Sequence, residues 1–282
     1  MNISEYLKNA SEILLKSEIA EARRDANTLL GFVLQKDRTF LIAHSEYELT
    51  ESEQTRFDEA IERRAKREPL QHITGKQEFF GLEFEVNKDV LIPRPETELI
   101  VENALEILKN LENSRFCEVG VGSGCISISI LHENKNASGK GLDISEKALK
   151  VAKRNAEKHQ VSERFDLQIS DVFEVLKDEK FDIIVSNPPY ISMQEIQGLD
   201  AEVKDFEPLN ALTDGNDGFS IIVKIIRESP KFLKPKGFLL MEIGFGQAEE
   251  VLKMIDEKNW SEVEIVADLQ NIPRMLKTRR VN

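Results

Sequence analysis

The chain has 282 residues, enough for one large domain or two of ordinary size, and its 40% of hydrophobic residues argues against disorder. The formal net charge of -13 argues against a surface that covers nucleic-acid phosphates, so we expect no stable nucleic-acid partner. Two cysteines are too few for a disulfide framework and show no metal-ligand spacing, so we expect a cytoplasmic location and no metal. Charges throughout residues 1–15 predict no signal peptide, and no apolar run is long enough to span a membrane.

Residues 1–75 are predicted to form a small helical bundle. Thr50 and Glu53 match a capping box, and Pro69 should end the helix that follows them. The basic run 63–68 could meet an acidic partner, although a solvated helix face is the commoner explanation of such a run. Apolar residues recur near helical spacing in residues 2–19, 23–35 and 50–68.

A β-hairpin is predicted in residues 76–95, where it joins the bundle to a second domain. From Phe80 to Val86 apolar residues alternate with others, which is the pattern of a half-exposed strand. The prolines in residues 92–95 should kink the chain where the hairpin ends.

Helices and strands alternate in residues 96–282, which predicts βαβ units and a mostly parallel sheet covered by helices on both faces. Residues 270–280 are expected to form a final loop. Strands are predicted at 115–120, 139–144, 165–170, 181–187, 237–243 and 261–268. Helices are predicted at 96–110, 124–134, 145–160, 217–233 and 247–258, with Ser145 as an N-cap.

A glycine-rich loop follows the first of these strands. Gly120, Gly122 and Gly124 form a G-x-G-x-G series, which differs from the G-x-G-x-x-G dinucleotide fingerprint. Glycines there let a ligand approach the main chain at the sheet edge where open α/β sheets bind ligands. A tight turn without a ligand remains an alternative for this loop taken alone.

Two aspartates end the next two predicted strands and favour the ligand hypothesis. Asp143 lies where a carboxylate can accept both ribose hydroxyls of an adenosine-containing ligand. Asp171 could accept from an adenine amino group, and Val172 could pack against the ring. The glycine loop and the two aspartates together predict one nucleoside-shaped site.

The fourth strand ends in Asn187, Pro188, Pro189 and Tyr190. Two consecutive prolines have no N–H to donate, so the chain must leave the sheet in a rigid turn. Such a turn presents an amide, free carbonyls and an aromatic ring where a substrate would meet the nucleoside. A plain strand end, with Tyr190 as a half-buried core aromatic, is the alternative.

These motifs together resemble the class I S-adenosylmethionine-dependent methyltransferases, and "NPPY" resembles members that methylate planar amide or amino nitrogens. "IPRPETELIVE", with the helical N-terminal region, is similar to the peptide chain release factor glutamine methyltransferases (HemK/PrmC) over nearly the whole chain. The likeness departs at Glu118, where the family more often has Asp. It implies a Rossmann-like domain with a mostly parallel seven-stranded sheet at 96–282, a hairpin linker, and a substrate-recognition domain at 1–75. The role of residues 94–98, toward donor, substrate or domain junction, stays open.

The resemblance implies methyl transfer from S-adenosylmethionine to the glutamine N5 of the GGQ motif in class I release factors, a step that belongs to translation termination. Catalysis is expected from Asn187, Pro188 and Tyr190, and substrate binding from these three and Pro189. Donor binding is expected from Gly120, Val121, Gly122, Ser123, Gly124, Asp143, Asp171, Val172 and Asn187.

Three other functions remain as alternatives. The ribosomal protein L3 glutamine methyltransferases share "NPPY" but are expected to lack "RPETE". A nucleic-acid amino methyltransferase could use the same motif, although the net charge of -13 argues against it. A module that only senses S-adenosylmethionine would not need the acceptor groups of Asn187 and Pro188.

Overall fold

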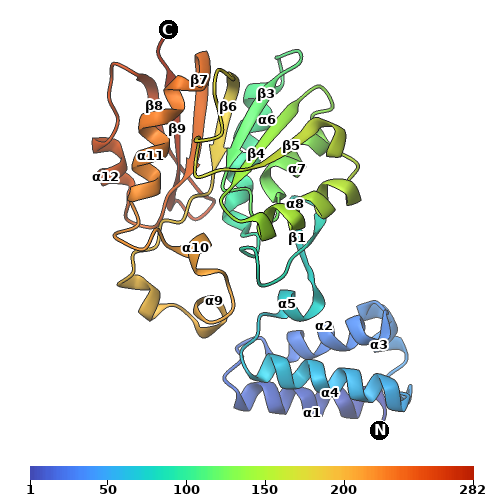
Figure 1. The fold of residues 1–282 in the computed structure, drawn as a ribbon. Coiled ribbons are helices and arrows are strands. Elements are labelled where there is room, and N and C mark those ends of the chain that lie inside the picture. The colour runs from blue at the N-terminus through green and yellow to red at the C-terminus, as the bar shows by residue number, and fades with distance from the viewer. The chain divides into compact units, whose positions relative to one another are not determined.

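The computed structural model describes residues 1–282, which divide into two compact units (Figure 1). The first, called here the helical unit, comprises Met1–Lys76 and the distant segment Asp200–Phe206. The second, called the sheet unit, comprises Gln77–Leu199 and Glu207–Asn282. None of the helices combines the length and the apolar character that crossing a membrane requires.

The helical unit confirms the predicted helical N-terminal region. Its apolar helix faces meet in a core in which Leu14, Leu29 and Phe57 are buried. The capping box is also confirmed, because Thr50 Oγ1 accepts from Glu53 N and the Glu53 carboxylate accepts from Thr50 N. Three short helices, α3, α5 and α9, have no counterpart in the predicted elements. The helices are α1 (Ile3–Lys16), α2 (Ala22–Leu34), α3 (Arg38–Ala43), α4 (Glu51–Ala65), α5 (Leu70–Thr74) and α9 (Ala201–Lys204).

A buried ion pair connects α4 to α2 and to the segment 200–206. The Arg64 guanidinium donates to Asp25 at 2.7 Å and to Glu202 at 3.0 Å. The other basic side chains of the run 63–68 also have acidic partners, so this run is not an unpaired basic surface. The additional pairs are Arg63 with Glu68, Lys66 with Glu62, and Arg67 with Glu202.

The predicted hairpin is present, but its turn lies elsewhere. Strands β1 (Lys76–Phe79) and β2 (Leu82–Glu85) pair in a two-stranded sheet. The expected strand from Phe80 to Val86 is wrong at its start, because Phe80 and Gly81 form the turn, with φ values of 50° and 70°. Positive φ at both central residues is typical of tight hairpin turns, whose twist matches that of the strands.

The sheet unit contains the predicted seven-stranded sheet, in the order β5-β4-β3-β6-β7-β9-β8. The neighbours from β5 to β7 pair in parallel, and β9 pairs antiparallel with both β7 and β8. The prediction of a loop at residues 270–280 is wrong, because most of this segment forms strand β9, which lies between β7 and β8 in the sheet. The strands are β3 (Arg115–Val119), β4 (Ser138–Asp143), β5 (Phe165–Ile169), β6 (Phe181–Ser186), β7 (Leu233–Glu242), β8 (Trp260–Ala267) and β9 (Pro273–Arg280).

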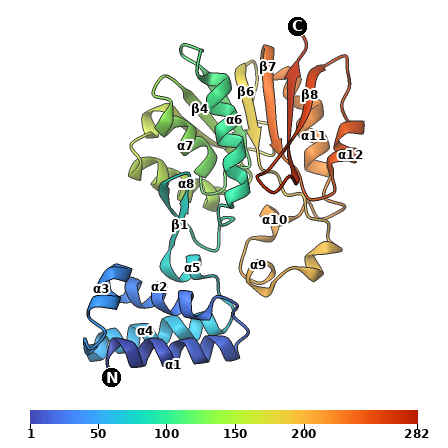
Figure 2. The same ribbon diagram turned by 180° about the vertical axis from the view of Figure 1, so that it is seen from behind.

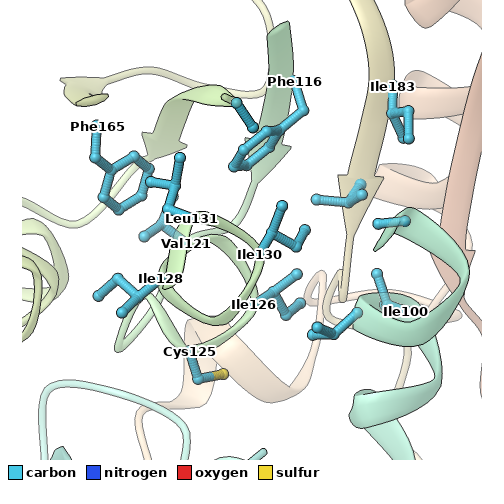
Figure 3. Close-up of a cluster of buried hydrophobic side chains, with 14 of the residues drawn as sticks. Ile100, Phe116, Val121, Cys125, Ile126, Ile128, Ile130, Leu131, Phe165 and Ile183 are labelled. Atoms are coloured by element: carbon cyan, nitrogen blue, oxygen red, sulfur yellow. The ribbon is translucent and has the colours of Figure 1, made fainter. Parts of the chain in front are cut away.

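Helices cover both faces of this sheet, as Figures 1 and 2 show from opposite sides. Successive strand residues point to opposite faces, so Phe116 packs into a core with α6, α7 and α8, while Cys117 packs into one with α11 and α12. Figure 3 shows part of the first core, with Ile126 and Ile130 of α7 beside Ile100 of α6. The helices are α6 (Glu98–Leu108), α7 (Cys125–Glu133), α8 (Glu146–Lys158), α11 (Ser220–Glu228) and α12 (Ala248–Lys253).

The connection between β6 and α11 is long and was not assigned any element from the sequence. It contains the short helices η3 (Glu195–Gly198), α9 and α10 (Leu209–Leu212). It starts at the proline-rich turn after β6, so this segment continues directly from the predicted catalytic motif. The remaining 3-10 turns of the sheet unit are η1 (Pro95–Thr97), η2 (Ser162–Arg164) and η4 (Ser229–Lys231).

Candidate active site

A cavity of about 300 Å³ lies in the sheet unit and is lined from the carboxyl ends of β3, β4, β5 and β6. Parallel strands end at the same sheet edge, so their loops surround one space, as in other open α/β sheets. The volume is at the lower end of the range for small-molecule sites. Of the predicted site residues, those lining it are Gly120, Val121, Gly122, Ser123, Asp143, Asp171, Val172, Asn187 and Pro189.

The glycine loop forms one wall of the cavity. Gly120 and Gly122 have φ values of 78° and 55°, a backbone conformation that residues with a Cβ rarely adopt. Gly124, in contrast, does not line the cavity. A Cβ on Gly124 would lie 2.8 Å from Ile128 Cδ1 and 3.3 Å from Ala152 Cβ, so this glycine permits close packing of α7 against α8.

Asp143 holds the glycine loop as well as lining the cavity. Its Oδ2 accepts from Gly122 N at 2.8 Å, and its Oδ1 accepts from Ser145 N at 2.8 Å. Burial raises the pKa of Asp143, and the two main-chain donors oppose this shift. Each carboxylate oxygen keeps a second lone pair, so both can still accept a hydroxyl from a ligand. Ser145 caps α8, as predicted, by accepting from Ala148 N at 3.2 Å.

The ends of β4 and β5 supply apolar and acidic groups. Ile144, which the sequence argument did not single out, lines the cavity and is 63% exposed, so it offers an apolar face to a ligand. Val172 is buried and has a φ of 51°, an unusual value for a β-branched residue. Asp171 Oδ1 pairs with Lys224 Nζ at 3.0 Å, which leaves its Oδ2 to accept from a ligand.

The proline-rich turn after β6 brings two of its four residues to the cavity. Asn187 and Pro189 line it, whereas Pro188 is buried and, like Tyr190, is not part of the lining. The Asn187 Nδ2 group donates to Thr97 Oγ1 at 3.1 Å. Neither Asn187 Oδ1 nor the Pro188 carbonyl accepts a hydrogen bond from within the chain, so both can accept an N–H of a bound substrate.

Tyr190 is held on several sides. Its carbonyl accepts from Gln247 Nε2 at 2.9 Å, and its hydroxyl donates to Glu242 Oε1 at 3.1 Å. A Cβ on Gly218 would lie 2.2 Å from the Tyr190 carbonyl oxygen, and a Cβ on Gly244 would lie 3.0 Å from its ring. Burial and the nearby Glu242 carboxylate raise the pKa of the tyrosine, so it stays protonated.

The segment 93–97 belongs to this site. Pro93, Arg94 and Thr97 line the cavity. Arg94 Nη2 donates to the buried Glu207 at 2.6 Å. Thr97 Oγ1 donates to Glu242 Oε2 at 2.6 Å, and this carboxyl is also buried.

Glu118 is a buried carboxyl in the lining of the cavity. Its Oε2 accepts from both the main-chain N–H and the hydroxyl of Ser127. Burial raises the pKa of Glu118 to about 8, and the nearby Asp143 adds to the shift. The longer side chain therefore reaches α7 rather than projecting freely into the cavity. No group of three or more His, Cys, Asp or Glu side chains is placed to hold a metal ion.

Comparisons with known proteins identify the family of this chain. Residues 5–75 match the family model of the PrmC N-terminal domain, and residues 97–202 match that of the methyltransferase small domain. A methyltransferase structure from Pyrococcus furiosus has the same fold, with a TM-score of 0.51 and 18% identity over 72% of this chain and 90% of that chain. The release factor glutamine methyltransferase of Koribacter versatilis is 38% identical and the match covers 99% of both chains. That of Clostridium acetobutylicum is 38% identical over 98% of both. The expected resemblance is thus confirmed, and the chain belongs to the release factor glutamine methyltransferase family.

Proposed function

We propose that this chain transfers a methyl group from S-adenosylmethionine to the glutamine side-chain nitrogen in the GGQ motif of class I peptide chain release factors. The observation that carries the proposal is Asn187, whose Oδ1 has no partner within the chain and which lines the same cavity as the glycine loop and Asp143. The names of the relatives support release factors as the protein substrate.

The cavity residues fit an adenosine-containing donor. The second lone pairs of Asp143 suit two ribose hydroxyls, and the apolar side chains of Ile144 and Val172 suit a planar ring. The main chain of Gly120 and Gly122 is accessible because neither carries a side chain. The donor supplies an electrophilic methyl group on a sulfonium sulfur, so that the C–S bond breaks as the C–N bond forms.

The chain must make a poor nucleophile react, because the amide nitrogen lone pair is delocalised into its carbonyl. Asn187 Oδ1 and the Pro188 carbonyl would each accept one N–H of the glutamine, which fixes the nitrogen and increases its electron density. Correct orientation of two reactants contributes about 7–11 kcal/mol in favourable cases. Tyr190 would pack on the amide plane, and Pro189 would keep the turn rigid. The nitrogen then loses one proton to water.

The helical unit is proposed to recognise the release factor outside its glutamine. Several basic side chains on and beside α2 are exposed and form no ion pair within the chain, and Phe32 beside them is 44% exposed. These basic residues are Arg23, Arg24, Lys36 and Arg38. Changing Arg23 and Arg24 to Glu should raise KM for the whole release factor and leave KM for a short GGQ peptide unchanged. Equal effects on both substrates would contradict this role.

The substrate class is tested by incubation of the protein with methyl-labelled donor and one candidate substrate at a time. The candidates are a class I release factor, ribosomal protein L3, ribosomal RNA and DNA. We expect label in the release factor. Label in L3 or in a nucleic acid instead would assign the site to one of the alternative methyltransferases, and donor binding without any label would indicate a sensor.

A further inference from the structure

Three side chains, two of them from the proline-rich turn, are connected by hydrogen bonds to one carboxyl group. Asn187 Nδ2 lies 3.1 Å from Thr97 Oγ1, and Thr97 Oγ1 lies 2.6 Å from Glu242 Oε2. The other carboxyl oxygen, Oε1, accepts from the Tyr190 hydroxyl at 3.1 Å. Glu242 therefore contacts both side chains expected to act on the substrate, one directly and one through Thr97.

When Glu242 is ionised, its charge fixes the direction of every hydrogen bond among these side chains. An ionised carboxylate only accepts hydrogen bonds, so Thr97 must give its single hydroxyl proton to Glu242. Thr97 Oγ1 can then only accept from Asn187, which must turn its NH₂ group inward. The amide oxygen of Asn187 is consequently the atom left to face the cavity.

We propose that Glu242 is a positioning residue for methyl transfer, and that its carboxylate acts through Thr97 to select which end of the Asn187 amide faces the substrate. The inference rests on the proposed function, since a glutamine N–H needs an acceptor. The two ends of an Asn amide have nearly the same shape, so packing cannot choose between them, whereas hydrogen-bond polarity can. A flipped Asn187 would place N–H donors against the N–H donors of the substrate.

The variant Glu242→Gln keeps the shape of the side chain but no longer forces Thr97 to donate its hydroxyl proton to residue 242. A Gln Nε2 group can donate to Thr97, whose own proton then turns toward Asn187 and favours the flipped amide. Thr97→Val removes the connection itself, and Thr97→Ser restores a hydroxyl at the same place. Thr278→Val is a matched control, because Thr278 is fully buried and donates to Ser261 O at 3.0 Å but does not line the cavity.

We expect kcat on a GGQ peptide to fall by roughly 10- to 100-fold in Glu242→Gln and Thr97→Val, somewhat less than the loss from removing a catalytic donor or acceptor outright. Calorimetric affinity for S-adenosylmethionine should stay within about twofold, since Glu242 does not line the cavity and the Thr97 hydroxyl is already bonded to Glu242 and Asn187. Thr97→Ser should recover most of the loss, and Thr278→Val should keep the wild-type rate. Equal losses in Thr97→Ser and Thr97→Val, or near-wild-type kcat in Glu242→Gln, would overturn the inference.

A pH profile separates this role from a merely structural one. Burial raises the pKa of Glu242, while donation by Thr97 and Tyr190 and the charge of Arg274 lower it, and the nearby Glu96 raises it further. At saturating donor, wild-type kcat should therefore fall as the pH decreases through a value above the usual Glu range. Glu242→Gln should lack this acidic limb, and an identical limb in both proteins would contradict the role.

The last readout needs no turnover. In ¹⁵N-labelled protein, the side-chain amide signal of Asn187 is identified by its loss in Asn187→Ala. Its hydrogen exchange should be slow in the wild type and clearly faster in Thr97→Val and Glu242→Gln. If the wild type methylates no glutamine, the proposed function is wrong. The exchange measurement still tests the orientation of the Asn187 amide, and unchanged exchange in both variants would refute the inference.

Discussion

Asp143→Asn should weaken donor binding far more than it slows the reaction of bound donor. The carboxylate already accepts from Gly122 N and Ser145 N, both at 2.8 Å, and two lone pairs remain for the ribose. Asn has one acceptor oxygen, so at least one ligand hydroxyl loses its partner and one main-chain N–H faces an NH₂ group. A hydrogen bond to a charged group contributes about 1.5–3 kcal/mol. The donor Kd should therefore rise roughly 10- to 150-fold.

Isothermal titration calorimetry with S-adenosylmethionine measures this change directly. Asp182→Asn is the matched control, because Asp182 also accepts from a main-chain N–H, that of Arg115 at 2.8 Å, but lies at the opposite end of β6 from the cavity. It should bind the donor as the wild type does, and kcat of Asp143→Asn at saturating donor should stay close to that of the wild type. Unchanged donor affinity in a folded Asp143→Asn protein would refute the assignment of this residue.

Three further predictions concern charge. Asn187→Asp should react at a rate between those of the wild type and Asn187→Ala, because it keeps an acceptor but stabilises the sulfonium ground state, and single-turnover kinetics would measure this. The pKa of Glu118 is about 8 in the folded chain, whereas the unfolded chain has the usual, lower Glu value. Between these two pKa values the folded chain keeps a proton that the unfolded chain loses, so the contribution of Glu118 to stability falls as the pH rises to about 8. Donor-free Glu118→Gln should therefore gain in melting temperature relative to the wild type between about pH 6 and pH 8, and parallel curves would contradict this. Arg64→Ala should destabilise the helical unit by about 3–5 kcal/mol in urea unfolding, since it leaves the buried Asp25 carboxylate unpaired. The more exposed Arg63→Ala should cost under about 1 kcal/mol, and equal losses would argue against this explanation.

Much of the fold could be predicted because the spacing of apolar residues identifies helices and strands, and their order along the chain indicates the type of sheet. The run from Ile183 to Val185 is apolar without alternation, as a central parallel strand requires, and its strand β6 lies between β3 and β7 in the sheet. Strand β9 was not predicted because Pro273 and four basic residues make its sequence resemble that of a loop. The hairpin turn was misplaced because Phe80 continues the apolar alternation, although its φ is positive.

The candidate site could be predicted only where residues follow their strands directly. Asp143 and Asn187 come at strand ends, so the order of the strands brings them to one cavity. Thr97 and Glu242 were not singled out, because their role depends on a contact across 145 positions of the chain. The one available signal was an acidic residue, Glu242, at the end of the apolar run "GFLLME". A carboxyl that a strand carries into the core is seldom without partners, and Glu242 is indeed buried.

The most direct test of the central claim is single-turnover methylation of a class I release factor by the wild type and by Asn187→Ala, with the modified residue located by mass spectrometry. The account predicts one methyl group on the GGQ glutamine with the wild type. It predicts a rate about 10²–10³ lower with Asn187→Ala at saturating donor. A rate within a few-fold of the wild type would contradict it, and would mean that Asn187 only shapes the turn.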